Sequence, residues 1–159
     1  MGKLCKYVDV CVANEEDAAD VFGICAENTN VTAGEVNRNG YKDVARQLAE
    51  RFGFAKVAIT LRESISANDN IWSAMLYDGE NYCFSKKYKV HIVDRVGGGD
   101  SFCGGLIASC LNGYDSQMTV EFAAAASCLK HSIEGDFNLV SKEEVLKLAG
   151  GDASGRVQR

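Results

Sequence analysis

Three consecutive glycines and the aspartate that follows them, Gly97, Gly98, Gly99 and Asp100, have the clearest chemical meaning in the sequence. A predicted strand leads into them, and an apolar helical pattern follows at once. Glycine lets the backbone approach a ligand closely. A helix N-terminus directs free N–H groups and the positive end of its dipole outward. Together these features predict a phosphate-binding turn.

The carboxylate of Asp100 is unexpected in a turn that only holds phosphate, because it would repel the ligand. It is expected if it accepts a proton from a hydroxyl group that attacks the phosphate. A capped loop without catalysis is the plain alternative for such a pattern. Two other phosphate motifs are excluded. A Walker loop needs Lys-Ser/Thr where Gly105 and Leu106 stand, and a dinucleotide fingerprint needs glycine where Phe102 stands.

The elements around the turn predict an α/β fold, in which strands and amphipathic helices alternate. Asp78-Gly79 is typical of a hairpin turn, and Ser141 with Glu144 predicts a capping box. The predicted strands are Tyr7–Ala13, Lys56–Leu61, Ile71–Tyr77, Asn81–Ser85 and Tyr88–Val93. The predicted helices are Asn14–Ile24, Tyr41–Phe52, Asp100–Asn112, Thr119–His131 and Ser141–Ala149, with a polar irregular stretch at Glu27–Asn37. One apolar face of the helix after the glycines is expected to contain Phe102, Cys103, Leu106, Ile107, Cys110 and Leu111.

Composition limits the class of protein. The chain has 159 residues, 47% hydrophobic and 25% charged, which suits one globular domain. The net charge of -5 and the lack of a Lys/Arg cluster argue against a nucleic-acid surface. No apolar run is long enough to cross a membrane and Met1–Val12 lacks a signal-peptide pattern, so we expect a cytoplasmic protein. The seven cysteines include no CxxC pair, which favours reduced thiols over a disulfide framework or a metal site.

The stretch Val93–Leu106, VDRVGGGDSFCGGL, resembles the C-terminal signature of the ribokinase-type, or PfkB-type, carbohydrate kinases. The resemblance implies that Asp100 is the catalytic base and that Gly97, Gly98 and Gly99 form the anion hole for the transferring phosphoryl group. It implies ATP and Mg²⁺ as cofactors. The family uses Ala at Gly98, so we expect Gly98→Ala to be mild and Gly99→Val to be severe. Arg95 replaces the usual Thr, which counts against a monovalent-cation site near Asp94.

The stretch after the first predicted strand, Asn14 to Asp17, resembles the family's Asn-x-x-Glu motif, which influences magnesium and phosphate binding. The resemblance implies this role for Asn14 and for Asp17 or its neighbour Glu16, without assigning any residue as a direct metal ligand. A helix cap is the alternative for Asn14.

Two further stretches resemble the 2-keto-3-deoxygluconate kinase subgroup. Thr60, Arg62 and Ser64 belong to a TLRES sequence at the family's nucleotide-facing loop. The run Lys130–Asn138, KHSIEGDFN, resembles the end of the subgroup's sequences. The helix before it lines the adenine pocket in the family, which makes Ala124 a candidate nucleotide contact. Packing of an alanine-rich helix is the alternative for Ala124.

The resemblance implies a ribokinase-like three-layer α/β sandwich, of which this chain is the C-terminal half of a mostly parallel sheet with flanking helices. Residues 1–149 are expected to form the nucleotide-binding and catalytic half, and residues 150–159 a frayed tail. The implied function is ATP-dependent phosphoryl transfer to a sugar-acid hydroxyl, with the acceptor-binding half absent and the chain alone inactive. The alternatives are a non-catalytic nucleotide-binding remnant and a related ribose, fructose or nucleoside kinase. An uncovered first strand predicts a homo-oligomer.

Overall fold

The computed structural model describes residues 1–25 and 38–151. The predicted irregular stretch at Glu27–Asn37 lies outside these ranges, and so do residues 152–159 of the predicted tail. The first residue of that predicted tail, Gly150, is instead the last residue of a helix. The described helices are α1 (Gly2–Cys5), α2 (Glu15–Phe22), α3 (Arg38–Phe52), α4 (Gly98–Leu111), α5 (Ser116–Lys130) and α6 (Lys142–Gly150). The described strands are β1 (Val10–Ala13), β2 (Lys56–Ser64), β3 (Asp69–Tyr77), β4 (Tyr82–Phe84) and β5 (Tyr88–His91).

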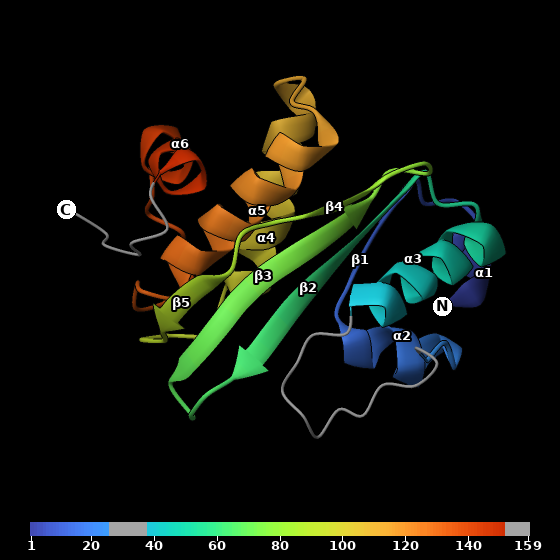
Figure 1. Cartoon of the computed structure of the whole chain (residues 1–159), viewed down its shortest axis with the longest axis horizontal. Coiled ribbons are helices and arrows are strands. Elements are labelled where there is room, and N and C mark those ends of the chain that lie inside the picture. Colours follow the sequence, from blue (N-terminus) through green and yellow to red (C-terminus); the bar gives the residue numbers. More distant parts are fainter. Residues whose placement is uncertain (26–37, 152–159) are drawn as a thin grey trace.

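The strands form one sheet with helices on both faces, which confirms the expected three-layer α/β fold (Figure 1). The helices α4, α5 and α6 cover one face, and α1, α2 and α3 lie on the other. The expectation of a mostly parallel sheet is wrong for the described strands. Only β1 and β2 pair in parallel, while β3 pairs antiparallel with β2, β4 and β5. Hairpin connections between β2, β3 and β4 cause this, because a tight turn reverses the chain direction.

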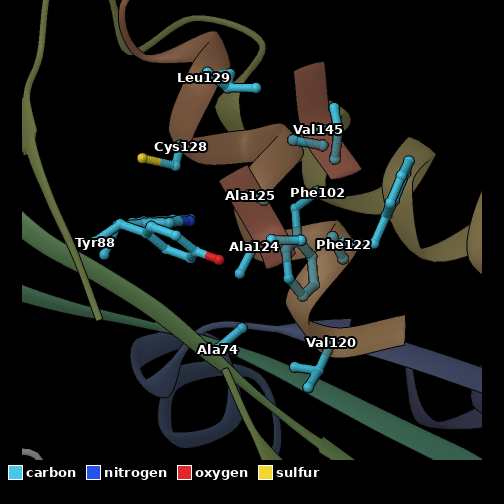
Figure 2. Close-up of a cluster of buried hydrophobic side chains, with 14 of the residues drawn as sticks. Ala74, Tyr88, Phe102, Val120, Phe122, Ala124, Ala125, Cys128, Leu129 and Val145 are labelled. Atoms are coloured by element: carbon cyan, nitrogen blue, oxygen red, sulfur yellow. The ribbon is translucent and has the colours of Figure 1, made fainter. Parts of the chain in front are cut away.

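The side chains of β2 point alternately to the two faces of the sheet and pack into a hydrophobic core on each face. Ala58 belongs to the cluster under α4, α5 and α6, whereas Val57 and Ile59 belong to the cluster under α2 and α3. Successive side chains of a strand point to opposite faces, so both faces of this central strand are apolar. In the first cluster, Tyr88 and Ala74 of the sheet face side chains of the helices (Figure 2).

Helices α4 and α5 approach each other closely. A Cβ atom on Gly105 would lie 2.9 Å from Cα of Ala123 and 3.2 Å from Cβ of Ala126. The small residues on both helices therefore allow a contact that larger side chains would prevent. Buried Glu121 fixes α5 to the sheet, since its carboxylate accepts hydrogen bonds from the Lys86 N–H at 3.0 and 3.1 Å and from the Tyr88 hydroxyl at 3.2 Å.

The order of the strands and helices agrees with the sequence prediction, whereas several of their bounds differ. Helices α3 and α5 each begin three residues earlier than predicted, and β2 continues three residues further, to Ser64. The first strand begins at Val10 instead of Tyr7, and the short helix α1 precedes it. Helix α4 begins within the glycines, at Gly98. The predicted apolar face of α4 is wrong in part, because Ile107 and Leu111 are 60% and 83% exposed. The face packed on α5 instead contains Ser101, Phe102, Gly105, Leu106 and Ser109.

The strand directions place several chain segments along one edge of the sheet. Strand β5 is antiparallel to β3, β3 is antiparallel to β2, and β2 is parallel to β1. Strands β1, β2 and β5 therefore run in the same direction, and their carboxyl ends meet at the same edge. The N-terminus of α2 follows β1 there, and the glycine turn follows β5. Ligands of α/β folds bind at this edge.

Candidate active site

The glycine turn joins β5 to α4 and begins the helix. Gly97 is the residue before the first helical one, with φ of 76°, in the left-handed region that favours glycine. A Cβ atom on Gly97 would also collide with the backbone oxygen of Asp136. Gly99 differs, since no atom lies within 4 Å of the place where its Cβ would stand. The turn is therefore closed behind Gly97 and open beside Gly99.

The turn presents free backbone donors. The Gly98 N–H donates to the Arg95 carbonyl at 3.3 Å, and the Ser101 N–H donates to the Gly97 carbonyl at 2.9 Å. The N–H groups of Gly97, Gly99 and Asp100 have no hydrogen-bond acceptor within the described part of the chain. Free N–H groups at a helix N-terminus attract anions. Of the three glycines predicted to form the anion hole, Gly97 and Gly99 thus have a free N–H group, whereas the Gly98 N–H is already bonded within the turn. The Asp100 N–H is a further free donor.

Residues of α5 support the turn from behind. The Ser127 hydroxyl donates to the Gly98 carbonyl at 2.8 Å, and His131 Nδ1 lies 2.8 Å from the Ser127 carbonyl. Because a carbonyl only accepts, Nδ1 carries the proton. The imidazole also packs on Trp72, with ring centroids 4.9 Å apart. Burial lowers the pKa of His131.

The contact between Gly98 and His131 contradicts one expectation. A Cβ atom on Gly98 would lie 2.8 Å from Nε2 and 3.0 Å from Cε1 of His131. We therefore expect alanine at position 98 to be costly in this chain, although the family uses it there. The imidazole occupies the space that the methyl group would need.

Asp94 joins the glycine turn to the loop after α5. Its Oδ1 accepts the Val96 N–H at 3.0 Å, and its Oδ2 accepts the Gly135 N–H at 2.8 Å. These two backbone hydrogen bonds hold the pKa of Asp94 below its ordinary value. Arg95 points the other way, since its guanidinium donates to the carbonyl of Ala67. Asp94 therefore holds in place the loop that closes Gly97 from behind.

A groove of about 640 Å³ begins at the glycine turn and runs between α4, α5 and α6. Asp100 and Gly97 line it at the turn, while Phe122 and Ala126 line it from α5. The loop before α6 contributes Asp136 through Lys142 on the remaining side, apart from Leu139. A mostly apolar groove of this size with a polar end is typical of small-ligand sites. Asp100 is exposed and stands where a bound ligand would meet the helix N-terminus.

Ala124 is not part of this groove. It is fully buried in the core cluster between α5 and the sheet, where Figure 2 shows it beside Phe102. Its side chain therefore cannot contact a ligand in the groove. Phe122 and Ala126 lie there instead. Their spacing of four residues places both on one face of the helix, opposite to Ala124. The sequence analysis did not single out these two residues. Helical periodicity places them on another face than Ala124, but it does not show which face borders the groove.

The residues predicted on β2 lie outside the groove. Thr60 pairs with Ala74 and Arg62 with Trp72, so both side chains share the face that carries α4 and α5. Ser64 donates to Asn70 Oδ1 at 3.2 Å near the carboxyl end of the strand. The three residues thus lie on the sheet face that carries α4 and α5, with Ser64 at the end of β2, but apart from the residues that line the groove.

The residues predicted to influence magnesium and phosphate binding lie at the N-terminus of α2. Asn14 Oδ1 accepts the Asp17 N–H at 2.8 Å, and Asp17 Oδ2 accepts the Asn14 N–H at 3.0 Å. This is a reciprocal capping box, so the alternative of a helix cap describes Asn14 in this structure. Glu16 is exposed in the first turn of the same helix. The described residues contain no group of three His, Cys, Asp or Glu side chains suited to a metal ion.

Comparison with known proteins identifies the class to which this fold and site belong. The family model described as pfkB family carbohydrate kinase matches residues 2–142. The chain therefore belongs to the PfkB family of carbohydrate kinases. No helix in the described residues is both long and apolar enough to cross a membrane.

Individual relatives agree with this assignment. The crystal structure of 2-dehydro-3-deoxygluconokinase from Thermotoga maritima is 51% identical, with a TM-score of 0.86, over 94% of this chain and 43% of that one. A PfkB family carbohydrate kinase from Listeria grayi is 30% identical, with a TM-score of 0.77, over 93% and 43%. The 2-dehydro-3-deoxygalactonokinase of Haloferax volcanii is 27% identical over 92% of this chain and 40% of its own length. The chain thus spans less than half the length of these relatives.

Proposed function

We propose that this chain carries the nucleotide site and the general base of an ATP-dependent sugar-acid kinase of the 2-keto-3-deoxygluconate type. The observation that carries the proposal is the position of Asp100. Its carboxylate stands in the first turn of α4, beside free N–H groups and at the end of a groove. A hydroxyl group held there would have both a proton acceptor and a phosphoryl group within reach.

Each part of the site has a separate task in this proposal. The N–H groups of Gly97, Gly99 and Asp100 hold the transferring phosphoryl group. Phe122 and Ala126 offer an apolar wall to the nucleoside. When bound, ATP supplies the phosphoryl group and Mg²⁺ neutralises phosphate charge. Mg²⁺ is commonly held by one or two carboxylates together with the phosphates of the substrate.

The residues around α2 and β2 have supporting roles in the proposal. Asn14, Glu16 and Asp17 influence magnesium and phosphate binding from the same sheet edge, with no direct metal contact. Thr60, Arg62 and Ser64 lie on the sheet face that carries α4 and α5, which is the face of the proposed nucleotide site. Sugar acid as the acceptor class is supported by the TLRES sequence and by the names of the Thermotoga and Haloferax relatives.

Residues 1–149 form the nucleotide-binding half of a longer kinase fold in this proposal. Positioning two reactants contributes about 7–11 kcal/mol to catalysis, so transfer also needs residues that hold the acceptor beside the nucleotide. We also propose self-association of the chain. Val10 and Val12 are each 38% exposed on β1, whose outer edge pairs with no described strand.

A transfer assay tests the proposal. The chain is fused behind the acceptor-binding part of the Thermotoga maritima enzyme, and ADP release is followed with 2-keto-3-deoxygluconate, ribose, fructose and a nucleoside. We expect turnover with the sugar acid, and a fall by orders of magnitude in Asp100→Asn with unchanged ATP affinity. Near-normal turnover of Asp100→Asn would show that Asp100 is not the general base. Higher turnover with ribose, fructose or the nucleoside would show that the acceptor is not a sugar acid.

A nucleotide-binding module without transfer activity is the second candidate. The observation in its favour is that the free N–H groups of the turn and the adjoining groove would bind a nucleotide equally well without phosphoryl transfer. The unfused chain separates the two candidates for this polypeptide. We expect it to bind ATP weakly and to release no ADP in response to sugar. Sugar-dependent turnover by the unfused chain would mean that it also contains acceptor residues.

A further inference from the structure

Lys130, the last residue of α5, is a buried charged side chain that the proposed reaction has not yet used. It is 0% exposed. Its ammonium group donates to the Ile133 carbonyl at 3.0 Å. Among the described residues no carboxylate forms an ion pair with it. Buried charges are usually paired, because removing them from water is costly. Lys130 is an exception to that rule.

Glu121, on the same helix, is a buried charged residue whose hydrogen-bond partners belong to other parts of the fold. Its carboxylate accepts hydrogen bonds from the Lys86 N–H and from the Tyr88 hydroxyl, which ties α5 to the sheet. Lys130 makes no comparable connection between elements, since Ile133 is only three residues away. An apolar side chain would fill its space at lower cost in free energy. The contacts within the fold therefore do not by themselves explain the positive charge.

The position of Lys130 indicates that use. Its Cε atom lies 3.1 Å from the place where a Cβ atom on Gly97 would stand. The aliphatic part of the side chain thus lies directly behind the glycine turn. Its charge also helps the Val96 and Gly135 N–H groups to lower the pKa of Asp94. A fixed positive charge at this place adds to the free N–H groups and to the helix dipole of α4.

We propose that Lys130 is a positioning residue of the phosphate site, whose buried ammonium makes the glycine turn attract the phosphates of a nucleoside diphosphate or triphosphate. This inference rests on the proposed nucleotide site. Lys130 acts through the turn, since its side chain lies against Gly97, which lines the groove, and does not line the groove itself. Its charge opposes the repulsion that the Asp100 carboxylate exerts on a bound phosphate. Adenosine has no phosphate and should not sense the charge.

The test compares wild type with Lys130→Met, which keeps the length of the side chain and removes the charge. Lys86→Met is the matched control, because the Lys86 ammonium also donates to a carbonyl, that of Ala149 at 2.7 Å, beside α6. Binding of ADP and adenosine is measured by calorimetry, and stability by urea unfolding. We expect Lys130→Met to lose about tenfold or more in ADP affinity, with unchanged adenosine affinity and equal or higher stability. Lys86→Met should keep its ADP affinity.

A second variant separates charge from packing. Lys130→Ala removes the atoms that propylammonium could replace, so this cation should restore ADP affinity while neutral propanol should not. Equal ADP affinity of wild type and Lys130→Met would overturn the inference and leave the nucleotide site intact. A parallel loss of stability and of both affinities would make Lys130 structural and also overturn it. Failure of the wild-type chain to bind ADP would overturn the nucleotide site itself, and the inference with it.

Discussion

Replacing Gly98 by alanine tests whether the glycine turn and His131 are fitted to each other. Gly98 is helical and lacks a positive φ, so the backbone accepts alanine. Helix propensity alone would then stabilise the variant by about 1 kcal/mol. The new methyl group, however, would lie 2.8 Å from Nε2 of His131. We expect this contact to outweigh the gain in propensity.

The magnitude follows from how firmly the imidazole is held. Its Nδ1 lies 2.8 Å from the Ser127 carbonyl, and its ring packs against Trp72 at 4.9 Å. Extra atoms in a packed site cost about 1–3 kcal/mol. Gly99→Ala is the matched control, because no atom lies within 4 Å of its Cβ position. Propensity favours both variants, so Gly98→Ala should be about 1–3 kcal/mol less stable than Gly99→Ala.

Urea unfolding of the two variants measures this difference directly. A double-mutant cycle with His131→Ala then assigns the cause, because removal of the ring should relieve the strain of Gly98→Ala. We expect a coupling free energy of about 0.5–3 kcal/mol between the two positions. Equal stability of Gly98→Ala and Gly99→Ala would refute the reasoning, as would a cycle without coupling.

Three further predictions concern the residues around the turn. Gly97→Ala should lose more than about 1 kcal/mol of unfolding free energy, since position 97 needs positive φ and a Cβ there meets Asp136; unchanged urea stability would contradict this. Burial lowers the pKa of His131, so the unfolded state takes up the proton more readily and stability should fall as pH drops below about 6.5. His131→Gln should remove this loss of stability at low pH, whereas His91→Gln should keep it. The opposite result would show that His131 does not cause the loss. Asp100→Asn should leave ADP affinity within about threefold or raise it, because it removes a negative charge, and a large calorimetric loss would mean that Asp100 binds nucleotide.

Features that depend on neighbouring residues could be predicted from the sequence. The capping box of Ser141 and Glu144 and the turn at Asp78-Gly79 need only local hydrogen bonds, and both are confirmed. The glycine turn followed by a helix was likewise expected, because glycines and an apolar periodic pattern determine it. The helix starts at Gly98, slightly earlier than the pattern indicated.

Features that depend on tertiary packing could not be predicted in the same way. Ala124 and Ala126 look alike in an alanine-rich stretch, and only the position of α4 and the sheet decides which one borders the groove. Ile107 looked buried because the pattern could not show which face of α4 meets α5. The conflict between position 98 and the His131 ring joins the start of α4 to the residue that follows α5, so neither segment alone reveals it.

The most direct test of the central claim is a titration of the chain with ADP, followed by the backbone amide resonances in heteronuclear NMR spectra. The account predicts that the amides of Gly97, Gly99 and Asp100 shift first and most strongly, because their N–H groups are free to bind phosphate. Ala126 in the groove should follow them. Saturable shifts confined to other parts of the chain, with these amides unmoved, would contradict the placement of the nucleotide site at the glycine turn.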